Sequence, residues 1–244
     1  MTVAESRIEK IDAIVLCGGL GKRLRSVVSG LPKSMADIHG RPFLEVLIEY
    51  IASFGIQRFI LCAGYKKEAI HTHFQSKKDG NCYVISGEAK PLGTGGALKA
   101  AFPLLRSSQF LVFNGDSFCR VDLNALVEFH SSVNATATLA LASVQDARDF
   151  GTIALKENHE IDVFKEKDTS FSAPALVNAG IYLFERSVLQ YFSPTETFSL
   201  ESDLFPSLVG NKLYGYMTGQ NLFDIGTPER LTVLRNYLQI NEVS

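Results

Sequence analysis

The sequence predicts an α/β fold in which helices cover a mixed, mainly parallel central sheet, and two patterns carry this prediction. In the first half of the chain, short apolar runs alternate with segments of helical period, which is typical of βαβ units. In the second half, closely spaced β-type runs have fewer helices between them, which indicates mixed or antiparallel pairing. The 244 residues can bury the core of one large domain.

The alternation is clearest between residues 11 and 116. The predicted strands are 11–17, 57–63, 81–86 and 109–116, and the predicted helices between them are 41–55, 65–74 and 95–105. In the first helix, Pro42 lies in the first turn, apolar residues recur at helical spacing, and Gly55 ends the helix. This helix is expected to lie flat on the sheet.

The second half consists mainly of β-type runs. They are 136–144, 151–157, 159–166 and 176–184, followed by the shorter runs 213–218 and 222–226. A final helix is predicted, with Thr227 as its N-cap and Pro228 at its first position. Because no flexible linker or internal repeat separates the halves, we expect one domain, residues 1–244, whose halves of about 1–121 and 122–244 share one sheet.

Composition and charge exclude several classes of partner. The formal charge is −2, from 24 basic and 26 acidic residues, so no overall field attracts nucleic acid or an anionic membrane. The polar start MTVAESRIEK carries no apolar signal segment, and no run approaches the roughly 18 apolar residues of a membrane span. We therefore expect a cytoplasmic protein. Its four cysteines form no C-x-x-C pair and are expected to be reduced and buried.

The stretch LCGGLGKRLRSVVSGLPK, residues 16–33, follows the first predicted strand and favours phosphate binding. Its glycines are Gly18, Gly19 and Gly21, and its basic residues are Lys22, Arg23, Arg25 and Lys33. A dinucleotide fingerprint would need glycine where Leu24 stands, and a P-loop would need Ser or Thr where Arg23 stands. Glycines let backbone N–H groups face an anion, while Lys and Arg neutralise its charge. A solvated turn is the alternative.

A second glycine cluster precedes the predicted helix at 95–105. Gly93, Gly95 and Gly96 would let the backbone approach a flat ring or a phosphate, although a tight loop into a helix explains them equally well. Two glycine loops that follow different strands of one sheet are a stronger signal than either alone, because ligands gather at strand carboxyl ends.

Two carboxylates end apolar strands, Asp116 after FLVFNG and Asp224 in NLFDIG. A poorly solvated carboxylate needs a partner, and Mg²⁺ prefers carboxylate and phosphate oxygens. Asx-turns at Asn114 and Asp116 and a cap at Asp224 are the structural alternatives. With the basic loop and no recognisable protein nucleophile, the pattern indicates phosphoryl or nucleotidyl transfer, in which positioning and charge neutralisation supply most of the catalysis.

Eight stretches resemble, in order, those of the sugar-1-phosphate nucleotidyltransferase family. They are LCGGLGKRL, LPKSMADIHGRPFLE, LGTGGAL, NGDS, FKEKD, VNAGIYLF, FSLESDLFP and FDIGTPE. The resemblance covers nearly the whole chain and implies a Rossmann-like three-layer sandwich. It also implies a magnesium-dependent reaction in which a sugar 1-phosphate oxygen attacks the α-phosphorus of a nucleoside triphosphate and releases pyrophosphate.

The resemblance further implies a role for each matching residue, with residues 1–121 as the nucleotide-binding half and 122–244 as the sugar-phosphate-binding half. The nucleotide would be bound by Leu16, Gly18, Gly19, Gly21, Lys22, Arg23, Lys33, Gly93, Thr94, Gly95, Gly96, Asn114 and Asp116. The sugar phosphate would be bound by Gly151, Glu166, Lys167, Asn178 and Glu201. The catalytic residues would be Arg23, Lys33 and Asp116, and the magnesium ligands Asp116 and Asp224. Lys22, Ser34 and Asp168 depart from the family's usual Thr, Pro and Pro.

Within the family, the resemblance is greatest to guanylyltransferases that use D-glycero-α-D-manno-heptose 1-phosphate, which implies GTP and that sugar phosphate as substrates and GDP-heptose for a surface polysaccharide as the product. Mannose-1-phosphate guanylyltransferases and sugar-1-phosphate uridylyltransferases are close alternatives. A silent nucleotide-sugar-binding regulator is disfavoured because Arg23, Lys33 and both aspartates are present. A glycosyltransferase would show D-x-D where Asp116-Ser117-Phe118 stands. The family also allows a homodimer.

Overall fold

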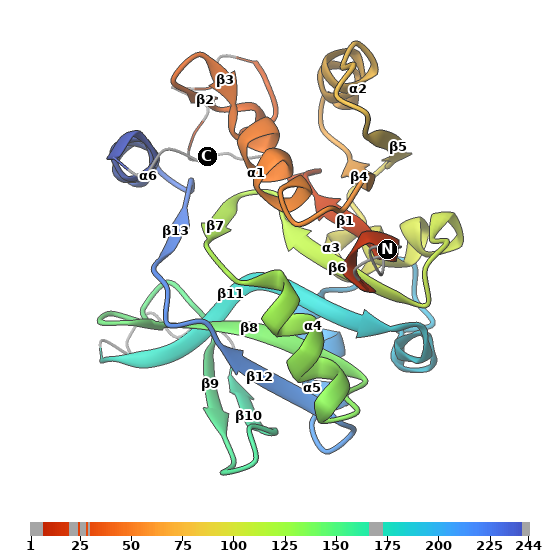
Figure 1. The fold of residues 1–244 in the computed structure, drawn as a ribbon, viewed down its shortest axis with the longest axis vertical. Helices are drawn as coiled ribbons and strands as arrows, with labels where there is room; N and C mark the ends of the chain where they lie inside the picture. The colour runs from red at the N-terminus through yellow and green to blue at the C-terminus, as the bar shows by residue number, and fades with distance from the viewer. Residues whose placement is uncertain (1–6, 20–23, 25–27, 29, 166–172, 241–244) are drawn as a thin grey trace, which may run out of the picture.

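A computed structural model describes residues 7–19, 24, 28, 30–165 and 173–240 of the chain. Its main sheet has nine strands, in the order β10-β9-β11-β6-β1-β4-β5, with β8 paired to β11 and β12 paired to β8 (Figure 1). The strands are β1 (Asp12–Leu16), β4 (Arg58–Ala63), β5 (Cys82–Gly87), β6 (Gln109–Asn114), β8 (Ala137–Val144), β9 (Thr152–Leu155), β10 (Ile161–Lys165), β11 (Ala175–Glu185) and β12 (Leu213–Met217). The predicted α/β fold is therefore confirmed.

Both halves of the chain contribute to this sheet. Strands β6, β1, β4 and β5 are parallel neighbours, as the βαβ pattern predicts. Strand β11 lies antiparallel to β6 on one side and to β8 and β9 on the other, so it joins the second half to the first. This pairing agrees with the expectation that both halves of the chain share one sheet.

The sheet is the middle of three layers, because successive strand residues face opposite apolar cores. In β1, Ala13 and Val15 face one core and Ile14 faces the other. Helices α1, α2 and α4 cover the first face, with α1 and α4 in front of the sheet in Figure 1, and α3 and α5 cover the second. The helices are α1 (Phe43–Ala52), α2 (Lys67–Gln75), α3 (Gly93–Ala101), α4 (Leu123–Ser132), α5 (Phe205–Leu208) and α6 (Pro228–Ile240).

Short elements complete the described chain. They are 3₁₀ turns at Arg7–Lys10, Lys33–Met35, Phe102–Leu104 and Arg186–Tyr191, a π-helical turn at Leu200–Leu204, and the strands β2 (Asp37–Ile38), β3 (Arg41–Pro42), β7 (Ser117–Cys119) and β13 (Leu222–Asp224). The antiparallel pair of β7 and β13 places Asp224 opposite Ser117. The backbone N–H of Ile225 also donates to the Asp116 carbonyl at 3.0 Å, so the two predicted metal ligands come from adjacent chain segments.

Three details refine the sequence-based expectations. The last helix begins at Pro228, as predicted. Cys17, Cys62 and Cys119 are buried, but Cys82 is exposed, which corrects the expectation of four buried thiols. In the described part of the chain, no helix combines the length and apolarity that a membrane span requires.

Candidate active site

A cavity of about 620 Å³, here called the large cavity, opens at the carboxyl ends of the parallel strands. It is lined by Leu16, Cys17, Gly18, Gly19, Lys33, Ser34, Cys62, Gly64, Tyr65, Glu88, Ala89, Lys90, Pro91, Leu92, Gly93, Thr94, Ala97, Asn114, Gly115, Asp116 and Glu201. Parallel α/β sheets bind ligands at this edge, because the strand ends point loops and helix N-termini into one crevice. Most of the described residues that are predicted to bind the nucleotide line this one cavity.

Gly18 lies where the loop after β1 passes closest to the loops after β4 and β5. A Cβ added to Gly18 would lie 2.9 Å from Glu88 Oε1 and 3.0 Å from the backbone N of Gly64. A larger residue at position 18 would press on the Gly64 backbone and would displace the Glu88 carboxylate, so the close approach of the three loops favours glycine here. Phosphate binding by the backbone of this loop stays a prediction.

Glu88 is a cavity residue that the sequence reasoning missed. Its Oε2 accepts a hydrogen bond from the Leu92 backbone N–H at 3.2 Å, which fixes the carboxylate at the cavity wall. Burial raises the pKa of Glu88 above its ordinary value of 4.5. The available signal was its place at the end of the run 81–86, the same kind of position as Asp116.

The second glycine cluster is used differently at its two ends. Gly93 and Thr94 line the large cavity, whereas the backbone N–H groups of Gly95 and Gly96 donate to the Phe198 carbonyl at 3.0 and 3.2 Å. Gly93 has φ +73°, and a Cβ there would lie 2.5 Å from the same carbonyl oxygen. Packing of α3 against the Phe198 segment thus accounts for these glycines, and Gly95 and Gly96 are outside the cavity lining.

A second cavity of about 170 Å³, here called the small cavity, adjoins the first. It is lined by Lys33, Asn114, Asp116, Ser117, Asp149, Phe150, Asn178, Gly180, Leu222, Asp224, Gly226 and Arg230. Lys33, Asn114 and Asp116 line both cavities. The two cavities therefore meet at Lys33 and Asp116, the two described residues that are predicted to be catalytic.

Lys33 and Asp116 are in direct contact at this meeting point. Lys33 Nζ donates to Asp116 Oδ2 at 2.8 Å, and the Lys33 side chain is 15% exposed while that of Asp116 is 49% exposed. Lys33 begins a 3₁₀ turn after Pro32, whose extended conformation (φ −58°, ψ 149°) directs the chain into the turn. Because the Asp116 side chain is half-exposed and pairs with Lys33 through Oδ2, its carboxylate still faces both cavities.

Tyr182 on β11 holds one candidate residue from each half. Its hydroxyl accepts hydrogen bonds from Asn178 Nδ2 at 2.8 Å and Asn114 Nδ2 at 3.3 Å. The side chain is fully buried, and burial raises its pKa well above the usual value, so the hydroxyl stays protonated. Tyr182 was not singled out from the sequence, where it looks like one more aromatic residue of a core strand.

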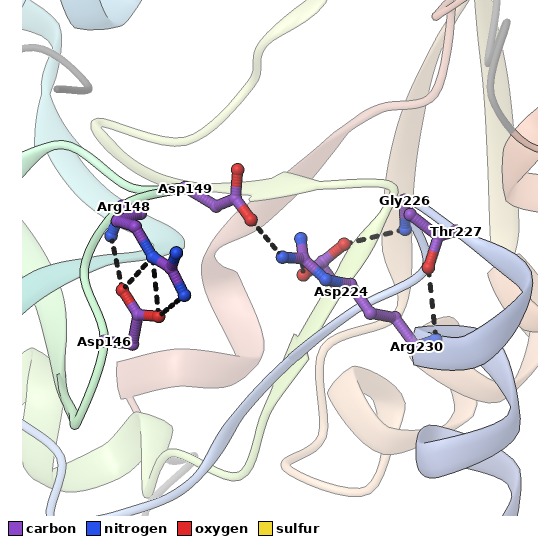
Figure 2. Close-up of polar contacts among 7 residues, drawn as sticks. All are labelled: Asp146, Arg148, Asp149, Asp224, Gly226, Thr227 and Arg230. Carbon is purple, nitrogen blue, oxygen red and sulfur yellow. Dashed lines mark hydrogen bonds and ion pairs between the residues drawn. The ribbon is translucent and has the colours of Figure 1, made fainter. Parts of the chain in front are cut away.

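Asp224 is fixed by groups from the turn that follows it (Figure 2). Its Oδ1 accepts from the Gly226 backbone N–H at 2.7 Å, and its Oδ2 accepts from Arg230 Nη1 at 2.9 Å. Arg230 Nη2 also donates to Asp149 Oδ2. Burial alone would lower the pKa of Arg230, but the Asp224 charge and the hydrogen bonds to both carboxylates raise it.

The remaining sugar-side candidates divide between the two cavities. Asn178 lines the small cavity, but Glu201 lines the large one, where it accepts hydrogen bonds from Thr94 Oγ1 and Ser199 Oγ at 2.8 Å each. Gly151 lines neither of these cavities, and a Cβ there would lie 2.9 Å from the Lys165 carbonyl oxygen. Its neighbours Asp149 and Phe150 line the small cavity instead.

Five predicted residues lie outside the described residues. They are Gly21, Lys22, Arg23, Glu166 and Lys167. Their roles stay predictions.

The donor set of the small cavity is suited to a hard cation. Asp116 and Asp224 both line it, and the buried atoms Asn114 Oδ1 and Ser117 Oγ have no hydrogen-bond partner among the described residues. Oxygen donors of this kind match a divalent cation such as Mg²⁺. Within the described ranges, no three His, Cys, Asp or Glu side chains cluster as a complete metal cage. An ion here would therefore need further oxygen ligands, which phosphates commonly supply.

Comparison with known proteins agrees with this geometry. The family model described as nucleotidyl transferase matches residues 12–239. The chain is 39% identical over 230 residues to D-glycero-α-D-manno-heptose 1-phosphate guanylyltransferase of Aneurinibacillus thermoaerophilus, covering 94% of this chain and 99% of that protein. It is 37% identical to mannose-1-phosphate guanylyltransferase of Mycobacterium tuberculosis, covering 90% of this chain and 62% of that one.

The fold is also found in solved structures. The crystal structure of HddC from Yersinia pseudotuberculosis superposes with a TM-score of 0.82 at 31% identity, covering 93% of this chain and 99% of HddC. HddC complexed with GMP-PN superposes with a TM-score of 0.79. By its sequence over nearly its whole length, this chain belongs to the nucleotidyl transferase family.

Proposed function

We propose that this chain transfers a guanylyl group from GTP to D-glycero-α-D-manno-heptose 1-phosphate. A phosphate oxygen of the sugar phosphate would form a bond to the α-phosphorus of GTP while the bond from that phosphorus to the β-phosphate oxygen breaks, which gives GDP-heptose and pyrophosphate. The observation that carries the proposal is the meeting of the large and small cavities at Lys33, Asn114 and Asp116. A nucleotide in one cavity and a sugar phosphate in the other would react at this point.

The large cavity is suited to guanine because Glu88 presents a carboxylate at its wall. The Watson–Crick edge of guanine carries N1–H and N2–H₂ donors, whereas the pyrimidine N3–H offers a single donor. An ionised carboxylate accepts with both oxygens and can take both guanine donors at once, whereas a protonated carboxyl group turns one oxygen into a donor. The names of the heptose- and mannose-specific relatives agree with guanine as the base.

Lys33 would neutralise charge on the α-phosphate, since its ammonium lies at the junction of the cavities and is mostly shielded from solvent. Asp116 and Asp224 would hold Mg²⁺, which when bound stabilises the negative charge on phosphate oxygens. Such charge neutralisation supplies most of the catalysis in phosphoryl transfer. The protein does not need to supply a nucleophile, because a phosphate oxygen of the sugar phosphate is the nucleophile.

The proposal is tested by measuring pyrophosphate release with four nucleoside triphosphates against a panel of sugar 1-phosphates, with Mg²⁺ or with EDTA. We expect release with GTP and the heptose 1-phosphate only when Mg²⁺ is present. Release with mannose 1-phosphate instead would favour the second candidate, which the 37% identical relative supports. Absence of release with every pair would rule out the enzymatic proposal. The cytoplasmic location and the homodimer stay predictions.

A further inference from the structure

The guanidinium of Arg230 bridges two carboxylates that come from different parts of the chain (Figure 2). Nη1 donates to Asp224 Oδ2 at 2.9 Å, and Nη2 donates to Asp149 Oδ2, 81 positions away in the sequence. All three side chains line the small cavity and are between 20% and 36% exposed. Partial burial makes such charged hydrogen bonds stronger than those of a fully exposed pair.

The Asp224 side of this bridge is built by local sequence. The segment Asp224-Ile225-Gly226-Thr227 leaves β13 and enters α6, and Arg230 lies in the first turn of that helix. The Gly226 N–H holds one carboxylate oxygen and Arg230 holds the other. With both oxygens bound, the carboxylate has one orientation before any ligand arrives.

The Asp149 side of the bridge belongs to the segment 145–151, which leads into β9. Within it, Asp146 and Arg148 pair with each other and are exposed, so they satisfy their charges locally. Asp149 instead reaches α6, and its neighbour Phe150 lines the small cavity. Phe150 also packs against the core and its N–H donates to the Ala147 carbonyl at 2.9 Å, so the Arg230–Asp149 contact adds a second anchor to this part of the cavity wall.

The three side chains of the bridge carry a net charge of −1, because two carboxylates share one guanidinium. Arg is suited to this task, since its planar fork offers two parallel donor directions, whereas a Lys ammonium is a point charge on a flexible stem. A lysine at this position would preserve the charge but could not keep both carboxylates in fixed orientations.

We propose that Arg230 is a positioning residue that couples the Asp224 carboxylate to the segment 145–151, and so shapes the reacting side and the sugar side of the small cavity together. The assignment of that cavity to the sugar phosphate rests on the proposed function. The physical coupling between α6 and segment 145–151 does not, and it can be measured without turnover.

Steady-state kinetics of Asp149→Asn, Arg230→Lys and their double variant test whether Arg230 acts on both Asp149 and Asp224. Asp149→Asn should raise the KM for the sugar 1-phosphate by about tenfold and change kcat and the KM for GTP by less than about twofold, because it loses one charged hydrogen bond. Arg230→Lys should raise the same KM and also lower kcat by about tenfold, because Asp224 loses its fixed orientation. The double variant should have the same sugar 1-phosphate KM as Arg230→Lys alone, since both remove one interaction.

Amide hydrogen exchange of the ligand-free protein gives the second readout. Segment 145–151 should exchange about tenfold faster in both Asp149→Asn and Arg230→Lys, although Arg230 is remote in sequence. The control is Glu128→Gln, which changes the charge of an exposed residue on α4 that lines neither cavity. It should exchange as the wild type does.

Two results would overturn the coupling: unchanged exchange of segment 145–151 in Arg230→Lys, or additive KM effects in the double variant. If pyrophosphate release fails with every substrate pair, the proposed function is wrong, while the exchange measurement still decides whether Arg230 holds the segment.

Discussion

Lys33 and Asp116 form an ion pair of 2.8 Å between segments that are 83 positions apart, and both residues line both cavities. The strand order explains the contact, since β1 and β6 are parallel neighbours and the chain after each one leaves the same edge of the sheet. Under the proposed function, the nucleotide and the sugar phosphate would meet at this pair.

Replacing Lys33 by Met removes the charge and keeps the length of the side chain. We expect kcat to fall by roughly 10²- to 10³-fold, because a preorganised cation at the reacting phosphate is lost. Lys33→Arg should keep part of the activity. Steady-state pyrophosphate release checks both, and near-normal turnover of Lys33→Met would remove this residue from the mechanism.

Asp116→Asn and Asp224→Asn should each lower turnover by about a hundredfold or more, because each removes a carboxylate from the proposed Mg²⁺ site. Raising the Mg²⁺ concentration should restore part of the activity of either variant. Asp162→Asn serves as the control, since that carboxylate lies on β10 outside both cavities. Equal activity of all three variants with the wild type would contradict the metal assignment.

Glu88 predicts a pH dependence of GTP binding. Its pKa in the folded protein is raised above 4.5 by burial, so the carboxyl is protonated at pH values where an exposed glutamate is already ionised. Because only the ionised form accepts from both guanine donors, the KM for GTP should fall as pH rises through this raised pKa and should rise again as pH falls through it.

The matching variant is Glu88→Gln, which should weaken kcat/KM for GTP by about 10- to 100-fold and abolish this pH dependence. Activity with UTP, if measurable, should change less. A pH profile that is identical in wild type and variant would show that Glu88 does not contact the base.

Tyr50 offers a prediction for stability. Its hydroxyl donates to the Val121 carbonyl and accepts from the Val121 N–H, both at 2.6 Å, in a buried position between α1 and the segment before α4. Tyr50→Phe leaves two buried backbone groups without this partner and should lower the free energy of unfolding by about 1–3 kcal/mol. Urea denaturation measures the change, and Tyr191→Phe at a half-buried position should cost less.

Local sequence patterns determined much of this protein. Short apolar runs that alternate with helical-period segments predicted the parallel strands and their helices, because these patterns depend on neighbours a few positions apart. The glycine loop, Asp116 and Asp224 were found because each follows a predicted strand, and strand carboxyl ends meet in such folds. The start of the last helix at Pro228 followed from capping alone.

Contacts between distant segments were decided by the tertiary structure. Gly95 and Gly96 pack on Phe198, Glu88 joins the cavity wall, Tyr182 on β11 holds Asn114 on β6, and Arg230 bridges to Asp149. None of these pairs leaves a local periodicity, since each depends on strand order and on where loops cross. The sequence therefore determined which chemical groups reach the sheet edge, and folding determined which of them touch.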